Sequence, residues 1–142
     1  MKKIKMIAAL VVLITTSAYA QKLNASKVPA VVKTAFTKQY PGTVAKWELE
    51  DGKYEASFKQ NGSSMSVIYE ANGTMTESEI GIKVSELPAT AVAYVKEHYK
   101  GKTIQEGAKI TKADGTINYE AELKGKDIVF DANGKFLKEV KD

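Results

Sequence analysis

Tyr69-Glu70-Ala71-Asn72-Gly73 and Phe130-Asp131-Ala132-Asn133-Gly134 are two versions of one pentapeptide, and this repetition decides the fold. The stretch Ser26-Lys27-Val28-Pro29-Ala30 likewise returns as Ser85-Glu86-Leu87-Pro88-Ala89, in the same order along the chain. Self-similarity at a long period indicates a duplicated structural unit. A unit of this size is marginally stable alone, so we expect two repeats, about 26–82 and 85–142, to complete a single domain, residues 21–142.

Each copy begins with the pattern of an amphipathic helix. Apolar residues recur at three- and four-residue spacing from Val28 to Tyr40, with Ser26 as N-cap, Pro29 in the first turn and Pro41-Gly42 after the end. The second copy repeats this arrangement between Ser85 and Gly101. The spacing therefore predicts two helices of about a dozen residues.

After each helix the apolar period changes to two, which is typical of strands with one buried face. Asp-Gly and Asn-Gly pairs separate the runs and predict tight hairpin turns. We expect about four antiparallel strands after each helix, in a two-layer α+β fold with the helices on one face of the sheet. The side chains predicted to face the helices are Ala45, Trp47, Leu49, Tyr54, Ala56, Phe58, Met65, Val67 and Tyr69, and Ala108, Ile110, Tyr119, Ala121, Leu123, Ile128 and Phe130.

The N-terminus has the pattern of a signal peptide. A Lys-rich start precedes an apolar run from Met6 to Ile14, and Ala18-Tyr19-Ala20 provides small residues for cleavage. We expect residues 1–20 to be removed between Ala20 and Gln21, which leaves a periplasmic or secreted protein. The apolar run is too short to span a bilayer, and no later segment of the mature chain is apolar enough to do so.

Composition excludes several classes of function. Three of the 21 basic residues leave with the signal peptide, so 18 lysines face 17 acidic residues in the mature chain. Every basic residue is lysine, and arginine is the residue that reads phosphates and base edges, so we expect no nucleic-acid partner. The chain has no cysteine, which excludes disulfides and a lipoprotein anchor.

The order of these motifs resembles a known family. Leu/Val-Pro-Ala before a helix, Tyr-Pro-Gly or Tyr-Lys-Gly after it, hairpins with Tyr-Glu-Ala, and the closing Ala-Asn-Gly turn are similar to the PepSY-like family, also described as β-lactamase-inhibitor-like. The resemblance covers both copies, roughly residues 26–142. It implies small exported bacterial proteins with a duplicated helix-plus-sheet unit, and it assigns no molecular role.

Single residues that could form a site have simpler interpretations. Trp47 could anchor a partner, but its position in the alternation places it in the core. His98 is the only histidine and has no cysteine or carboxylate cluster that would indicate a metal or a catalytic base. The pairs Glu48 with Glu50 and Glu77 with Glu79 are typical of a solvated strand face. No catalytic, metal or cofactor site is predicted, and we expect no enzyme.

The sheet face turned away from the helices remains as the surface free to recognise a partner, since an antiparallel sheet can leave one face in water. We expect a non-catalytic periplasmic binding module that engages a protein or peptide. The alternative is a carrier of a small ligand or cation, with a pocket between the two copies. The residues predicted to form the binding face are Lys46, Glu48, Glu55, Ile68, Asn118, Glu120, Glu122 and Val129.

Overall fold

The computed structural model describes residues 20–141. The predicted signal peptide therefore lies outside the described residues, apart from Ala20. The fold is α+β, with two α-helices and an antiparallel sheet whose strands are hydrogen-bonded in chain order, β1 to β9. The described chain forms two compact units: the first contains residues up to 81 together with 110–116, and the second contains 82–109 together with 117–141.

The order of elements in the first half of the chain returns in the second half. A short 3-10 helix is followed by a ten-residue α-helix and four strands in both. The bounds are β1 (Gln21–Leu23), η1 (Ala25–Lys27), α1 (Ala30–Gln39), β2 (Lys46–Glu50), β3 (Lys53–Gln60), β4 (Ser63–Tyr69), β5 (Met75–Ile82), η2 (Val84–Glu86), α2 (Ala89–His98), β6 (Glu106–Lys112), β7 (Ile117–Leu123), β8 (Lys126–Asp131) and β9 (Phe136–Lys141).

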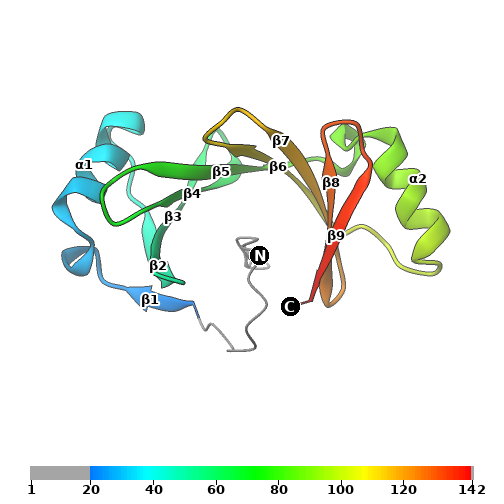
Figure 1. Ribbon diagram of the computed structural model, residues 1–142, viewed down its shortest axis with the longest axis horizontal. Helices are drawn as coiled ribbons and strands as arrows, with labels where there is room; N and C mark the ends of the chain where they lie inside the picture. Colours follow the sequence, from blue (N-terminus) through cyan, green and yellow to red (C-terminus); the bar gives the residue numbers. More distant parts are fainter. Residues whose placement is uncertain (1–19, 142) are drawn as a thin grey trace. The chain divides into compact units, whose positions relative to one another are not determined.

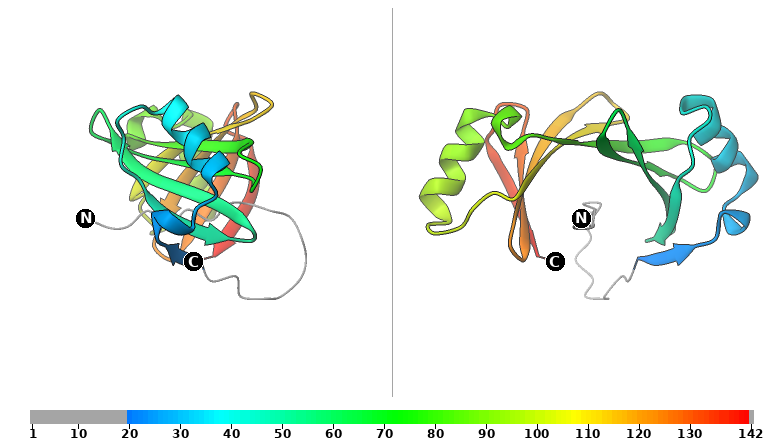
Figure 2. Two further views of the ribbon diagram at one scale, coloured as in Figure 1. Left: turned by 90° about the vertical axis from the view of Figure 1, so that its left-hand side faces the viewer. Right: turned by 180° about the vertical axis from the view of Figure 1, so that it is seen from behind.

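In the first unit, α1 covers one face of the strands that follow it (Figures 1 and 2). Val32 and Phe36 on the helix and Trp47, Phe58 and Tyr69 on the strands are buried in one cluster. The ring of Phe36 meets those of Trp47 and Phe58 edge-on, with centroids 5.4 and 5.3 Å apart. Such edge-to-face pairs add to the free energy of apolar burial. The prediction that Trp47 lies in the core is confirmed.

In the second unit, α2 packs in the same way against β7, β8 and β9 (Figure 1). Ala91 and Val95 on the helix contact a cluster that includes Leu123, Ile128 and Phe130, all essentially inaccessible to water. Alternating side chains on an antiparallel strand reach opposite faces of the sheet, which is why the period-two pattern identified these core positions correctly.

The repeated Ala-Asn-Gly turn has a structural explanation. In each turn the glycine amide donates a hydrogen bond of 2.9 Å to the carbonyl three residues earlier: Gly73 to Glu70, and Gly134 to Asp131. Gly134 packs against the first turn of α2, where an added Cβ would overlap Thr90 Oγ1 and come within 2.9 Å of Ala91 N. Gly73 lies in the same way beside Val31 on α1. The motif therefore brings a tight turn, with φ near +80°, against the start of its own helix.

Two local expectations are corrected in each copy. Pro29 and Pro88 are the residues before α1 and α2 rather than part of their first turns, and the serines at 26 and 85 lie in the short 3-10 helices that precede them. The X-Pro bond and the proline ring favour an extended backbone before the helix begins, which is why the 3-10 turn and the α-helix remain separate.

The side chains of strand β6 face the opposite sides of the sheet from those expected. A Cβ on Gly107 would lie 3.2 Å from the Leu87 side chain in the core under α2. Because neighbouring side chains alternate, Ala108 and Ile110 face away from that core. Both are buried, yet neither belongs to the clusters under α1 or α2. Glycine at 107 allows Leu87 and Ile82 to pack directly on the strand, and this close packing fixes the orientation.

Candidate functional site: the far face of the sheet

For each unit we define the far face as the side of its strands that points away from its own helix. In the first unit this face carries Lys46, Glu48, Glu55 and Ile68 of the predicted binding residues. Glu48 lies directly opposite Glu55 on the neighbouring strand, and Glu55 lies opposite Ile68. The structure therefore brings these three side chains into one row across β2, β3 and β4.

The second unit carries the other four predicted residues. Glu120 lies opposite Val129, and Glu122 lies opposite Asp127, so two rows cross from β7 to β8. Asn118 is opposite Asp131 at the end of the same pair of strands. These residues form a group of their own on the far face of the second unit.

The expectation of a water-exposed face is wrong for most of these side chains. Lys46 is exposed, and Glu48 and Glu122 are half-buried. Glu55, Ile68, Asn118, Glu120 and Val129 keep no more than 9% of their surface accessible. They lie on strands with a neighbour on each side, where side chains in opposed positions are about 5 Å apart at Cβ and interact with one another.

Sequence reasoning missed three further polar side chains on this face. Ser66, Glu79 and Asp127 are buried, although Glu79 was expected on a solvated face together with Glu77. Their positions could have been found from register, since Ser66 and Glu79 are opposed and Asp127 is two residues from Val129. Their burial could not, because alternation gives the face of a side chain and not what surrounds it.

Burial also alters the electrostatics of the first unit. The pKa of the Glu55 carboxyl is raised to about 7, mainly by loss of hydration on burial; the charges of Glu48 and Glu50 act in the same direction, and hydrogen bonds from Ser66 and Ser57 act in the opposite one. Burial, then Asp51 and Glu48, raises the pKa of Glu50 as well. The carboxyls of Glu55 and Glu50 are therefore easier to protonate than ordinary glutamates.

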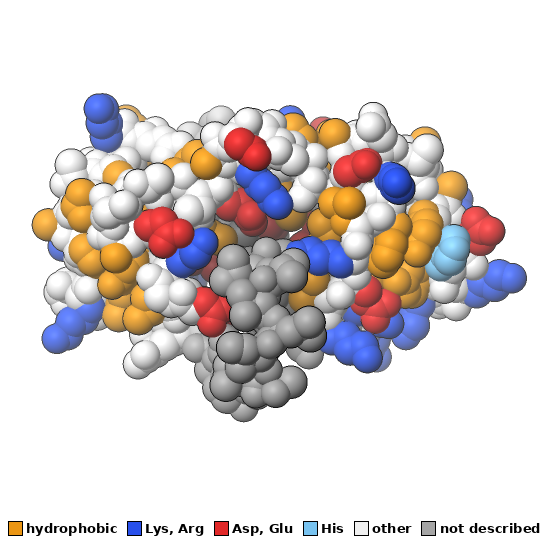
Figure 3. All heavy atoms as spheres, in the orientation of Figure 1, with side chains coloured by type: hydrophobic (Ala, Val, Ile, Leu, Met, Phe, Trp, Pro, Cys, Tyr) orange, Lys and Arg blue, Asp and Glu red, His pale blue; other side chains and the backbone are white. Residues whose placement is uncertain are grey.

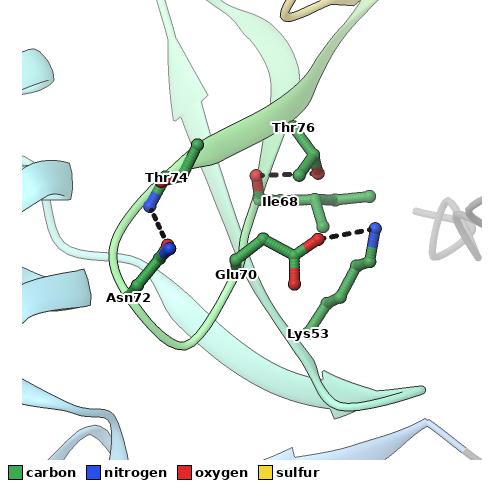
Figure 4. Close-up of polar contacts among 6 residues, drawn as sticks. All are labelled: Lys53, Ile68, Glu70, Asn72, Thr74 and Thr76. Atoms are coloured by element: carbon green, nitrogen blue, oxygen red, sulfur yellow. Dashed lines mark hydrogen bonds and ion pairs between the residues drawn. The ribbon is translucent and has the colours of Figure 1, made fainter.

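Lys53 lies two residues before Glu55 on β3, but it pairs with Glu70. Lys53 Nζ lies 3.0 Å from Glu70 Oε1, at the start of the turn that leads to β5 (Figure 4). In the same region Thr74 N donates 2.9 Å to Asn72 Oδ1, and Thr76 Oγ1 donates 3.3 Å to Ile68 O. These contacts fix the turn and hold β4 against β5.

The remaining candidate residues have structural surroundings. His98 stacks on Tyr94 with ring centroids 3.9 Å apart, and its Nδ1 is 3.0 Å from Tyr94 O. Within residues 20–141 no group of three or more His, Cys, Asp or Glu side chains is arranged to hold a metal ion. Asp131 Oδ1 accepts from Asn133 N and Lys135 N, so the segment after β8 is a hairpin turn that uses its carboxylate internally.

A second polar cluster joins β8, β9 and the end of α2. Tyr99 Oη donates 2.7 Å to Glu139 Oε2, and Lys126 Nζ lies 2.9 Å from Glu139 Oε1. Both contacts lower the pKa of the Glu139 carboxyl, while burial, followed by Glu139, raises the pKa of Tyr99 to about 12. Each polar group has a partner, so this cluster stabilises the second unit.

Lysines and acidic side chains are interspersed over the face drawn in Figure 3. Such a mixture is typical of a soluble surface and gives no single-sign field for a polyanion. Within the part of the chain that the structure describes, no helix has the length and apolar character needed to cross a bilayer.

Solved structures share this fold. A DUF2874 family protein from Bacteroides uniformis ATCC 8492 is 19% identical, with a TM-score of 0.69, over 80% of this chain and 88% of that one. A protein from Bacteroides eggerthii DSM 20697, described as a "putative periplasmic" protein, is 17% identical with a TM-score of 0.67 over the same shares. A BLIP-like protein from Bacteroides fragilis NCTC 9343 is 21% identical with a TM-score of 0.59, over 80% and 86%.

No curated protein matches the chain. A family model described as "Putative beta-lactamase-inhibitor-like, PepSY-like" matches twice, over residues 14–77 and 52–138. The two matches together include both helices and all strands except the end of β9. With its alternation of one helix and four strands and with these matches, the chain belongs to the PepSY-like family of β-lactamase-inhibitor-like proteins.

Proposed function

We propose that this chain is a non-catalytic binding module of the periplasm that engages a protein or peptide partner through the far face of one or other of its units. The observation that carries the proposal is the composition of that face. In each unit an apolar side chain, Ile68 or Val129, lies in a row with polar and acidic side chains on regular strands. Ile68 and Val129 are buried within the fold, and the charged side chains on the same strands are suited to the polar contacts of a protein interface.

The accessible members of the face define where contact begins. Lys46, Glu48 and Glu122 keep water-accessible surface, whereas Ile68 and Val129 lie beneath their neighbours. A partner would therefore meet the charged side chains first. The buried members form the rigid base that positions them.

Two inferences about the chain accompany this proposal. We infer that the chain is a duplication of one helix followed by four strands, supported by the matching element order and by the two family-model matches. We also infer export with cleavage after Ala20. Strand β1 begins at Gln21, so the residue expected at the new N-terminus is already paired with Leu49 on β2.

The binding proposal is tested by capture of partners from envelope extract with residues 21–142 as bait and identification by mass spectrometry. A Lys46→Glu/Glu48→Lys/Glu122→Lys variant changes only accessible far-face charges. A Lys33→Glu/Lys38→Glu variant changes charges on α1 and is the control for altered surface charge elsewhere on the chain. We expect a species captured by the wild type and the helix variant to be lost with the far-face variant, and equal capture by all three would contradict the proposal.

A further inference from the structure

We propose that Glu55 makes the first unit responsive to pH: the fold holds a proton on this carboxyl in mildly acidic medium, and its loss at neutral pH weakens the packing of the far face. This inference concerns stability and does not depend on the proposed binding function.

The position of Glu55 in the sheet disfavours a negative charge. Its directly opposed neighbour on β2 is Glu48, another carboxylate, and its neighbour on β4 is Ile68, which offers no polar atom from its side chain. Like charges in opposed positions of an antiparallel pair are destabilising. A proton on Glu55 removes this repulsion, and a protonated carboxyl also costs less to bury than an ionised one.

The groups within reach of Glu55 can pair with its carboxyl in either protonation state. Only 6% of the residue is accessible. Ser57 Oγ lies 3.4 Å from its Oε1, and Ser66 forms a second hydrogen bond with the carboxyl. A hydroxyl can donate to an ionised carboxylate or accept from a protonated one, so both serines remain partners in either state.

The lysine two residues before Glu55 on β3 is held by another carboxylate. Lys53 is paired with Glu70 at 3.0 Å. Among the charges that raise the pKa of Glu55 are those of Glu48 and Glu50. Strand β4 contributes only uncharged side chains to this face, and α1 covers the opposite one. The charged groups that share the far face with Glu55 are Lys22 on β1, Lys46, Glu48 and Glu50 on β2, Lys53 and Lys59 on β3, and Glu77 and Glu79 on β5.

The direction of the pH dependence follows from linkage. The pKa of Glu55 is about 7 in the fold against an ordinary value of 4.5, so between these values the folded state binds a proton that the unfolded chain has released. The free energy of unfolding therefore falls as pH rises from about 4.5 to about 7. Above that range the contribution of Glu55 no longer changes with pH. The unfolding equilibrium constant of the unit is expected to rise roughly 100-fold between pH 5 and pH 8 from this group alone.

Urea denaturation of residues 21–142 between pH 5 and pH 8 tests the proposal. Trp47, the sole tryptophan, lies in the core of the first unit, and its fluorescence reports that unit. We expect the wild-type midpoint to fall as pH rises, and the midpoint of Glu55→Gln to change much less and to exceed the wild type at pH 8. Glu97→Gln, an exposed position on α2, is the control and should keep the wild-type dependence.

A titration of the intact wild-type chain gives a second readout if the Glu55→Gln variant does not fold. The 13C chemical shift of the Glu55 side-chain carboxyl, followed by NMR, should have its midpoint near pH 7, and Glu48→Gln should lower that midpoint. A midpoint near 4.5, or a Glu55→Gln variant with the full wild-type pH dependence, would overturn the proposal.

Discussion

Replacement of Gly134 by alanine should be far more destabilising than the same change at Gly115, although both glycines have a positive φ, +79° and +85°. An L-residue in this backbone conformation costs about 1–2 kcal/mol. At Gly115 this is the whole cost, because a Cβ there would meet nothing within 4 Å. Gly115→Ala is therefore the matched control for the backbone term.

At Gly134 the added methyl group also collides with α2. It would overlap Thr90 Oγ1, so Thr90 must rotate and release its 2.6 Å hydrogen bond to Asn133 O, at a cost of about 0.5–1.5 kcal/mol. Ala91 N and Pro88 Cβ would still lie 2.9 Å away, and only a shift of the turn relieves those contacts. Overpacking of this kind costs about 1–3 kcal/mol. We expect a total of about 3–6 kcal/mol for Gly134→Ala.

The assay is urea denaturation followed by far-UV circular dichroism, with hydrogen exchange of β8 and β9 amides to localise the effect in the second unit. A Thr90→Ala/Gly134→Ala double variant should lose less stability than the sum of its single changes, because the overlap with Oγ1 is gone. Equal costs for Gly134→Ala and Gly115→Ala would show that the turn does not need to approach the helix, and would refute this account of the repeated motif.

Three further predictions concern the core, the N-terminus and the domain. Trp47→Ala removes a buried ring that packs against Phe36, and we expect a loss of about 3–5 kcal/mol in urea denaturation, whereas no loss would place the ring outside the core. Intact-mass measurement of envelope protein should give a chain that begins at Gln21, and retention of Met1 would contradict export. A fragment of residues 21–82 should fail to melt cooperatively, because it lacks residues 110–116 of the first unit. One of these, Ala113, donates a hydrogen bond of 2.9 Å from its amide to Thr76 O. A reversible, cooperative melt of that fragment would contradict the prediction of a single domain.

The hairpins could be predicted from the sequence because their signals are local. Asn-Gly and Asp-Gly pairs supply the positive φ that tight turns need, and the structure has turns at Asn61-Gly62 and Asp114-Gly115 where the pattern placed them. A slip of one residue in the pairing of these strands would turn their apolar side chains to the other face. Turn chemistry and alternation together were sufficient for most of the sheet.

The elements that were missed lack such signals. Strand β1 has three residues, Gln21–Leu23, which is too few for any period, and its partner β2 alone determines that it is a strand. The orientation of β6 depends on the absence of a side chain at Gly107, where Leu87 packs. Both features are set by long-range contacts, which local propensity does not encode.

The burial of the far face limits how a partner could use it. Among the described residues, no buried side-chain nitrogen or oxygen lacks a hydrogen-bond partner. A buried polar group that loses its partner costs about 1–3 kcal/mol, so a bound protein that displaced the hydrogen-bond partners of Glu55, Asn118 and Glu120 without replacing them would lose a large part of any binding free energy. Binding that leaves these groups in place and uses Lys46, Glu48 and Glu122 avoids that cost. For this reason charge changes at the accessible residues test partner recognition, whereas changes at the buried ones test stability first.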